Sequence, residues 1–533
     1  MTLKETINRK IIDPDTRYRW ITVAYMVLTT AMLMHHVWVA AYYATVEDGA
    51  IMLRFPWMIL AGAGIILGRM WKDKCFWLLL ALLLMKFLRI AIPMPDKLSE
   101  TQRVYELCVY SFFICYGAGR VLNGKDRKTF VSVFCALWTA AMAVYACFGL
   151  YPVLTGTSVW NLGTEGFYIR PAEQRLWPIF HPVEAGTMTA SGIAAAMVGF
   201  FMTKRKTARG LYLCAMVLMF LMGVFCISRT SYLLTAAGIA TPLSMLLYEQ
   251  LCRRKKQGKP FTGLRVATAL AAFSVMTVLL VLLQIKMIPA FNALRSNDTA
   301  LIPAAAAEEA AGGEIPLMTD GETGDAAGEE TAVQAPVQIS NREFVTDEGA
   351  DGFLTGRWLI WTHLIDCFER FPSYMLIGKG VYDPMEHINS FIRKGLAQPY
   401  IYHLHSTFIQ TLWESGFPGL IAFAAFFVVF VWNAFRLIRN RNLPLWQRLI
   451  PMPALLCWLA DMIDCTGYCN WGKPSMTILY FFSGLTIAIA LERRKRGRGA
   501  SGVRRLPGTR PVFRRLPVPL GPEPPPVWDR KAL

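Results

Sequence analysis

Two histidines near the end of a long polar segment are the residues of this chain best suited to chemistry. His403 and His405 come just before an apolar stretch that contains Glu414, Gly416 and Gly419. A neutral imidazole accepts a proton near neutral pH, so a histidine here could act as a general base. Side chains two residues apart point about 200° apart around a helix, so in a helical segment they should not act on the same atom. We place His405 at the centre and leave His403 as a structural or substrate-contact residue.

Arginines in other segments could bind an anionic group beside this base. Arg229 stands in so short a connector between apolar segments that its charge must lie at the membrane surface or slightly within it. Arg357 begins a stretch with helical periodicity, and a helix N-terminus already favours anions. A guanidinium is a planar fork that fits phosphate oxygens. The alternative is an arginine that only anchors the chain among lipid headgroups, and for Arg170 and Arg175 this structural role is favoured.

Metal chemistry has little support in the sequence. Neither histidine belongs to an HExxH-type pair, and no Asp or Glu accompanies them at the spacing of metal ligands. We therefore predict no metal and no other cofactor. Most cysteines lie in apolar segments, where they act as small hydrophobic residues. Cys465 and Cys469 are close together in a predicted external loop, where a disulfide or a metal site stays open as the lesser alternative.

The elements that must position these residues are membrane helices. The chain has 533 residues, 54% of them hydrophobic and only 17% charged, whereas a soluble domain carries about a quarter of charged residues. Apolar runs of about 20 residues recur from residue 20 to residue 491, which predicts an all-α polytopic membrane protein. We predict twelve spans, at 20–44, 51–68, 75–93, 104–122, 129–152, 186–203, 210–228, 231–251, 266–288, 412–435, 445–463 and 472–491.

The positions of the basic residues predict the orientation of these spans. The net charge is +18, and Lys and Arg are concentrated in the two termini and the even-numbered loops. The loops on the opposite side carry few of them, as the positive-inside rule requires. We therefore predict that both termini are cytoplasmic and that His405 lies on the external side. Because orientation explains the charge, we predict membrane lipids and no nucleic acid as partners.

Two long loops are predicted on the external side. Residues 153–185 form a compact, aromatic and Pro-rich excursion. In the larger loop, residues 298–351 are rich in Ala, Gly and acidic side chains and are predicted to be disordered. Apolar residues then recur at helical spacing in 352–405, which predicts an amphipathic helix across the membrane face. The predicted organisation is a cytoplasmic N-terminus (1–19), helices 1–9 (20–288), the large loop (289–405), helices 10–12 (406–491) and a basic, Pro-rich cytoplasmic tail (492–533).

The order and spacing of these motifs resemble the O-antigen ligase and polymerase superfamily. His405, followed after ten residues by Gly416 and then by Gly419, is similar to that family's His-Asn/Ser…Gly-x-x-Gly signature. Arg229 and the leucine four residues later resemble its Arg-x-x-x-Leu element. The segment 356–380 is similar to its "Arg…Trp…Pro-x-x-Gly-x-Gly" segment.

The resemblance implies a GT-C-like glycosyltransferase on the external face of a bacterial inner membrane, acting without a metal. The donor would be a glycan on undecaprenyl or another polyprenyl diphosphate. The acceptor would be a hydroxyl of another glycan or of a lipid-linked glycan, so the reaction is ligation or polymerisation. The implied site consists of a base (His405), diphosphate-binding arginines (Arg229 and Arg357), candidate substrate contacts (Arg170, Arg175, His403 and Glu414) and structural glycines (Gly416 and Gly419).

Two other classes share several of these features. A flippase for lipid-linked oligosaccharides would need charged residues near the bilayer midplane and pseudo-symmetric halves. Lys86 and Arg89 are the nearest candidates, but the sequence has no inverted repeat and no acidic partner for them within the spans. A non-catalytic membrane scaffold is the other alternative, and for it the motifs would be coincidental.

Overall fold

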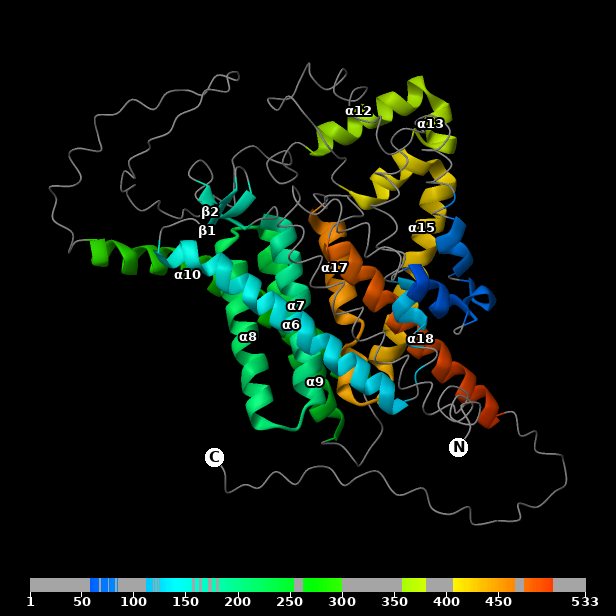
Figure 1. The fold of residues 1–533 in the computed structure, drawn as a ribbon, viewed down its shortest axis with the longest axis horizontal. Coiled ribbons are helices and arrows are strands. Elements are labelled where there is room, and N and C mark those ends of the chain that lie inside the picture. Colours follow the sequence, from blue (N-terminus) through cyan, green and yellow to red (C-terminus); the bar gives the residue numbers. More distant parts are fainter. Residues whose placement is uncertain are drawn as a thin grey trace, which may run out of the picture. The chain divides into compact units, whose positions relative to one another are not determined.

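The structure is a computed structural model, and it describes a large part of the chain (Figure 1). The chain divides into two compact units, Met1–Ala490 and Leu491–Leu533, and the helices below belong to the first, apart from the end of α18. The predicted span 20–44 and nearly all of 298–351 lie outside the described residues. The described residues are 58–66, 69–74, 76–81, 84, 112–117, 119, 122, 124–155, 159–162, 165–170, 175–178, 182–253, 262–299, 357–379, 406–464 and 474–501.

Long apolar helices make up most of the described chain, which confirms the all-α membrane class. Six helices within these ranges are long and apolar enough to cross a membrane: Arg127–Thr155, Pro182–Met202, Lys206–Phe225, Arg229–Leu251, Leu264–Asn292 and Thr407–Arg439. Each coincides with one of the predicted spans. The full count of twelve stays a prediction. The elements are η3 (Met70–Lys72), α6 (Gly124–Thr155), α7 (Pro182–Met202), α8 (Lys206–Phe225), α9 (Arg229–Arg253), α10 (Thr262–Thr299), α12 (Arg357–Arg370), α13 (Pro372–Ile377), α15 (Thr407–Arg439), α16 (Leu445–Leu449), α17 (Met452–Asp464) and α18 (Pro474–Ser501).

Helix α7 is the centre of the bundle. It is rich in Ala and Gly, it is buried over most of its length, and it packs against α6, α8, α9 and α17. Figure 1 shows α7, α8 and α9 side by side. Small residues let helix backbones approach closely in a membrane, where no hydrophobic effect drives helices together. Gly199 illustrates this, because a Cβ there would collide with the Tyr212 ring of α8.

Helix α10 lies at the outside of the bundle and is fixed to α9 by a buried amide. Its Leu and Val side chains are largely exposed, as expected of a surface that faces lipid. Gln284 is the exception, since it is fully buried. Its Nε2 donates to the Tyr232 carbonyl at 3.0 Å, and its Oε1 accepts from the Thr235 hydroxyl at 2.9 Å.

The predicted span 445–463 is not one continuous helix. Helix α16 ends at Leu449, two residues form a turn, and α17 begins at Met452. Pro451 lies in this turn, and a proline has no N–H to continue a helical ladder. Helix α17 has 13 residues, which is about 20 Å of helix and shorter than the hydrocarbon core of about 30 Å.

A small antiparallel sheet occupies the loop between α6 and α7. Its strands are β1 (Val159–Leu162), β2 (Glu165–Arg170) and β3 (Arg175–Pro178), in the order β1-β2-β3. The sequence predicted a compact excursion here but no strands. Arg170 and Arg175 stand directly opposite each other in the register of β2 and β3. The sheet packs on the ends of α6 and α7, where Leu176 is fully buried.

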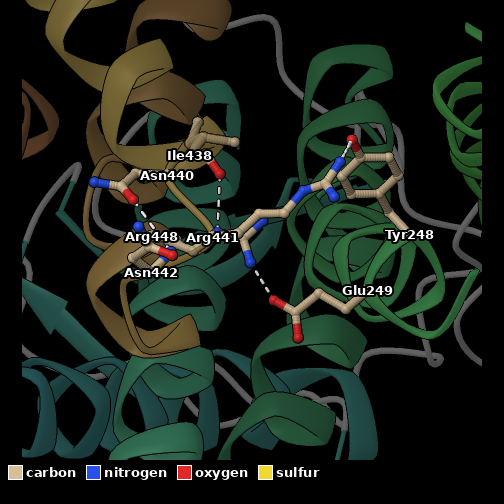
Figure 2. Close-up of polar contacts among 7 residues, drawn as sticks. All are labelled: Tyr248, Glu249, Ile438, Asn440, Arg441, Asn442 and Arg448. Atoms are coloured by element: carbon tan, nitrogen blue, oxygen red, sulfur yellow. Dashed lines mark hydrogen bonds and ion pairs between the residues drawn. The ribbon is translucent and has the colours of Figure 1, made fainter. Parts of the chain in front are cut away.

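A polar cluster joins the last turns of α9 to Arg441, in the turn that follows α15, and to Arg448 of α16 (Figure 2). The Arg448 guanidinium forms an ion pair with Glu249, and its Nε donates to the Ile438 carbonyl at 2.8 Å. Arg441 lies over the Tyr248 ring and donates to its hydroxyl. Arg448 is 3% exposed, whereas Arg441 lies at the surface. The cluster fixes α9 and α15 to each other at the ends opposite Arg229 and Ser406.

Candidate active site

Helix α15 begins with a polar segment that is buried although the rest of the helix is apolar. Its first nine residues, 407–415, include buried Thr407, Gln410, Thr411 and Ser415. Glu414 is also buried, at 2% exposure, and accepts a hydrogen bond from Gln410 Nε2 at 3.0 Å. Burying a carboxylate and several hydroxyls costs free energy that an apolar helix would avoid. This buried polar segment is therefore the part of α15 that is the best candidate for a functional role.

The polar segment is separated from the apolar remainder by a kink at Gly416. Gly416 has φ 65° and ψ −170°, a region that is essentially open to glycine alone. A Cβ at this position would lie 2.5 Å from the Leu376 carbonyl oxygen. Pro418 contributes as well, because it has no N–H for the helical ladder. At Gly419, a Cβ would collide with the Ser415 side chain.

The residues after α13 pack directly on this kink. Gly378 has φ 77° and ψ 166°, again in the glycine region, and a Cβ there would lie 2.5 Å from the Glu414 carbonyl oxygen. The Lys379 N–H donates to the Trp413 carbonyl at 2.7 Å. Two backbone segments thus touch without side chains between them, and this contact requires glycine on both sides.

Helix α12 forms where the periodicity predicts a helix, and its apolar face packs on the start of α15. Leu364, Cys367 and Phe368 share a core cluster with Trp413 of α15. The ring centroids of Phe368 and Trp413 are 6.0 Å apart. Burial raises the pKa of the Cys367 thiol, with Arg370 opposing and Asp366 adding to that shift. The thiol packs in the core cluster with Leu364, Phe368 and Trp413.

Arg229 is the first residue of α9 and is exposed. The turn before it is held by the hydroxyls of the residues that follow. Ser231 Oγ donates to the Gly223 carbonyl at 3.1 Å, and the Tyr232 hydroxyl donates to the Val224 carbonyl at 3.0 Å. Both acceptors are last-turn carbonyls of α8, where the helical donors run out. The Val224 carbonyl also accepts from the Ile227 N–H at 3.2 Å. Arg229 is therefore presented by a rigid helical hairpin.

Residues 214–424 match the family model described as O-antigen ligase. The match covers less than half of the chain, and this segment is similar to the O-antigen ligase family. No curated protein matches the chain. The matched segment begins in α8 and ends in α15, and it contains the Arg229 hairpin, α12, α13 and the kink.

The matched O-antigen ligase segment separates the predicted site residues into two groups. Arg229, Arg357, His405 and Glu414 lie inside it, whereas Arg170 and Arg175 lie in the sheet before it. Glu414 and Gly416 are brought into contact with the end of α13 and the residues that follow it, and Arg229 stands on a separate element. His403, His405 and the side chains of Arg357, Arg170 and Arg175 lie outside the described residues.

Several contacts at the candidate site were not predicted from the sequence. Gln410 is one turn from Glu414, and the spacing of four residues could have revealed the pair. The hydroxyls of Ser231 and Tyr232 had no recognisable signal, because their acceptors belong to the preceding helix. Gly378 was part of a motif, but nothing in the sequence indicated that it contacts Gly416.

Proposed function

We propose that this protein transfers a glycan from a polyprenyl-diphosphate donor to a hydroxyl acceptor on the external face of the membrane. The observation that carries the proposal is the O-antigen ligase match over residues 214–424. This one segment includes the candidate base and both candidate diphosphate-binding arginines. Transfer of glycans is the shared activity of the superfamily, and the donor, the acceptor and the face of the membrane are our proposals.

In the proposed reaction the acceptor hydroxyl oxygen bonds to the anomeric carbon of the donor sugar. The bond between that carbon and the diphosphate oxygen breaks, and the polyprenyl diphosphate leaves with the electron pair. His405 takes the proton of the acceptor hydroxyl. Arg229 and Arg357 stabilise the negative charge that develops on the leaving group.

The buried polar segment of α15 supports this assignment. His405 directly precedes Ser406, which is the N-cap residue of α15. A base at that position would directly precede the helical segment that carries Thr407, Gln410 and Glu414, whose oxygens and amide can accept from or donate to sugar hydroxyls. Glu414 and His403 are the proposed substrate contacts. For Arg170 and Arg175 only their position in the sheet before α7 supports such a role.

The test is reconstitution of the purified full chain with a polyprenyl-diphosphate oligosaccharide and a glycan acceptor. We expect a new glycosidic linkage from the wild-type protein. We expect a loss of about 10²- to 10⁴-fold in His405→Ala, because general-base help is worth about that much. Equal insertion and thermal unfolding of the two proteins serve as the folding control.

Each alternative class gives a different result in this assay. Movement of the donor between leaflets without a new linkage would replace the proposal by a flippase. Absence of both linkage and movement would leave a scaffold. Transfer by His405→Ala at the wild-type rate would remove His405 from the mechanism while leaving the transferase activity in place.

A further inference from the structure

The contact between the α13 end and the α15 kink joins two segments that are remote in sequence. Gly378 and Gly416 both adopt backbone angles that other residues do not tolerate. Each also lacks room for a Cβ because of the other segment's backbone. Such strained positions persist only where the surrounding structure over-determines them, and they gather at functional sites.

The kink leaves a helix carbonyl that the α13 end supplies with a donor. In a continuous helix the Trp413 carbonyl would accept from the N–H four residues later. Here Gly416 interrupts the helix, and the Lys379 N–H donates to that carbonyl instead, at 2.7 Å. Gly378 lies against the next carbonyl, that of Glu414, whose helical donor position is occupied by Pro418.

The same contact links α12 to the polar segment of α15. Helix α12 begins at Arg357 and packs through Leu364 and Phe368 on Trp413. Tyr374 of α13 also contacts the Trp413 ring, with centroids 5.8 Å apart. The helix that starts with a candidate diphosphate-binding residue and the helix that follows the candidate base therefore belong to one packed unit.

We propose that residues 376–379 form a clamp on the α15 kink and that Gly378 is a positioning residue for glycan transfer. The clamp fixes the direction of segment 407–415 relative to the membrane-spanning part of α15. It thereby sets the position of Ser406, where α15 begins, relative to α12. The catalytic meaning of the clamp rests on the proposed function, whereas its effect on the direction of α15 does not.

The first test is kinetic and uses Gly378→Ala in the reconstituted full chain. A Cβ at this position displaces the two backbones, and a misplacement of about 1 Å can cost about 10²-fold in rate. We expect kcat to fall about 10- to 100-fold while the donor KM stays within about twofold. Gly210→Ala is the matched control, because a Cβ at Gly210 meets nothing within 4 Å. An unchanged kcat in Gly378→Ala would overturn the assignment.

The second test measures the geometry without any activity. Spin labels on unnatural amino acids at Ser373 and Ile421, both exposed and on the two sides of the contact, report the distance between α13 and the apolar part of α15. We expect Gly378→Ala to shift or broaden this distance distribution and Gly210→Ala to leave it unchanged. An unchanged distance distribution in Gly378→Ala would reject the proposed clamp, even if the wild-type protein is an active transferase. A response of the labels in a protein without transferase activity rejects the proposed function and keeps the clamp.

If Gly378→Ala does not fold, substitutions of Lys379 decide the question. Lys379→Pro removes the N–H that bonds to Trp413, whereas Lys379→Ala keeps it. We expect the distance between the two labels to change in the proline variant and to stay unchanged in the alanine variant. The same distance in both would contradict the clamp.

Discussion

At the scale of single residues, the position of Arg229 depends on its neighbours' hydroxyls. Ser231 and Tyr232 bind the last carbonyls of α8, so the α8–α9 turn is fixed and Arg229 projects from a rigid corner. An arginine that merely reached for lipid headgroups would need no such support. The rigid hairpin favours a specific anion contact, for which a planar guanidinium fork is better suited than an ammonium.

We therefore expect both Arg229→Ala and Arg229→Lys to impair use of the diphosphate donor. A charge-assisted hydrogen bond is worth about 1.5–3 kcal/mol, which corresponds to a loss of about 10- to 100-fold. Steady-state transfer at varied donor concentration measures the effect. Arg436→Ala is the matched control, since Arg436 is an exposed arginine of the last turn of α15 that lies over Trp432. Equal effects of the Arg229 and Arg436 substitutions would support headgroup anchoring.

At the scale of elements, helix α15 is held near both of its ends. Helix α15 is fixed by the clamp near its start. Its end is held by Arg448 of α16, which donates to the Ile438 carbonyl and pairs with Glu249 of α9. Arg448 is almost fully buried, and its partner is 22% exposed. Removing one member of a buried pair costs more than the pair contributes, because a buried charge is left without its counterion.

We expect Glu249→Leu to lower the stability of the folded protein by about 1–3 kcal/mol, since it leaves Arg448 buried without its carboxylate. Thermal unfolding in detergent measures the change. The double variant Glu249→Leu with Arg448→Met should recover most of the loss, because it buries no charge. Arg441→Gln is the comparison at the exposed site and should cost less than about 1 kcal/mol. A loss in Arg441→Gln as large as that in Glu249→Leu would contradict this account.

At the scale of the whole molecule, function depends on which membrane face each helix end meets. The sheet between α6 and α7 and the α8–α9 turn lie at the same end of these consecutive antiparallel helices, while the α7–α8 turn lies at the other end. The α7–α8 turn is basic, with Lys204, Arg205 and Lys206 in sequence. The positive-inside rule therefore favours a cytoplasmic α7–α8 turn and an external Arg229.

Epitope insertions in the full chain test this orientation. We expect a tag between β2 and β3, within 171–174, to be accessible to antibody from outside intact spheroplasts. A tag inserted after Lys204 should become accessible only after permeabilisation, and so should a tag at the C-terminus. External accessibility of the Lys204 tag would invert the orientation and place Arg229 on the cytoplasmic side.

The sequence by itself determined the membrane class, the position of each of the six long described helices and the periodicity of α12. These properties are local, because a continuous apolar run of about 20 residues predicts a membrane helix and helical spacing of apolar residues predicts an amphipathic one. The motif residues pointed in the same way to the superfamily. The sequence missed the small sheet, whose short strands carry too few residues for a periodic pattern.

Only the tertiary structure decided which remote segments meet. It joined Gly378 to Gly416, and it paired Arg448 with Glu249 across 199 positions. Such contacts depend on the packing of whole helices, and no local pattern specifies them. A glycine in a motif indicates that a side chain is excluded, but only the folded chain shows that the excluding group is the backbone of another segment.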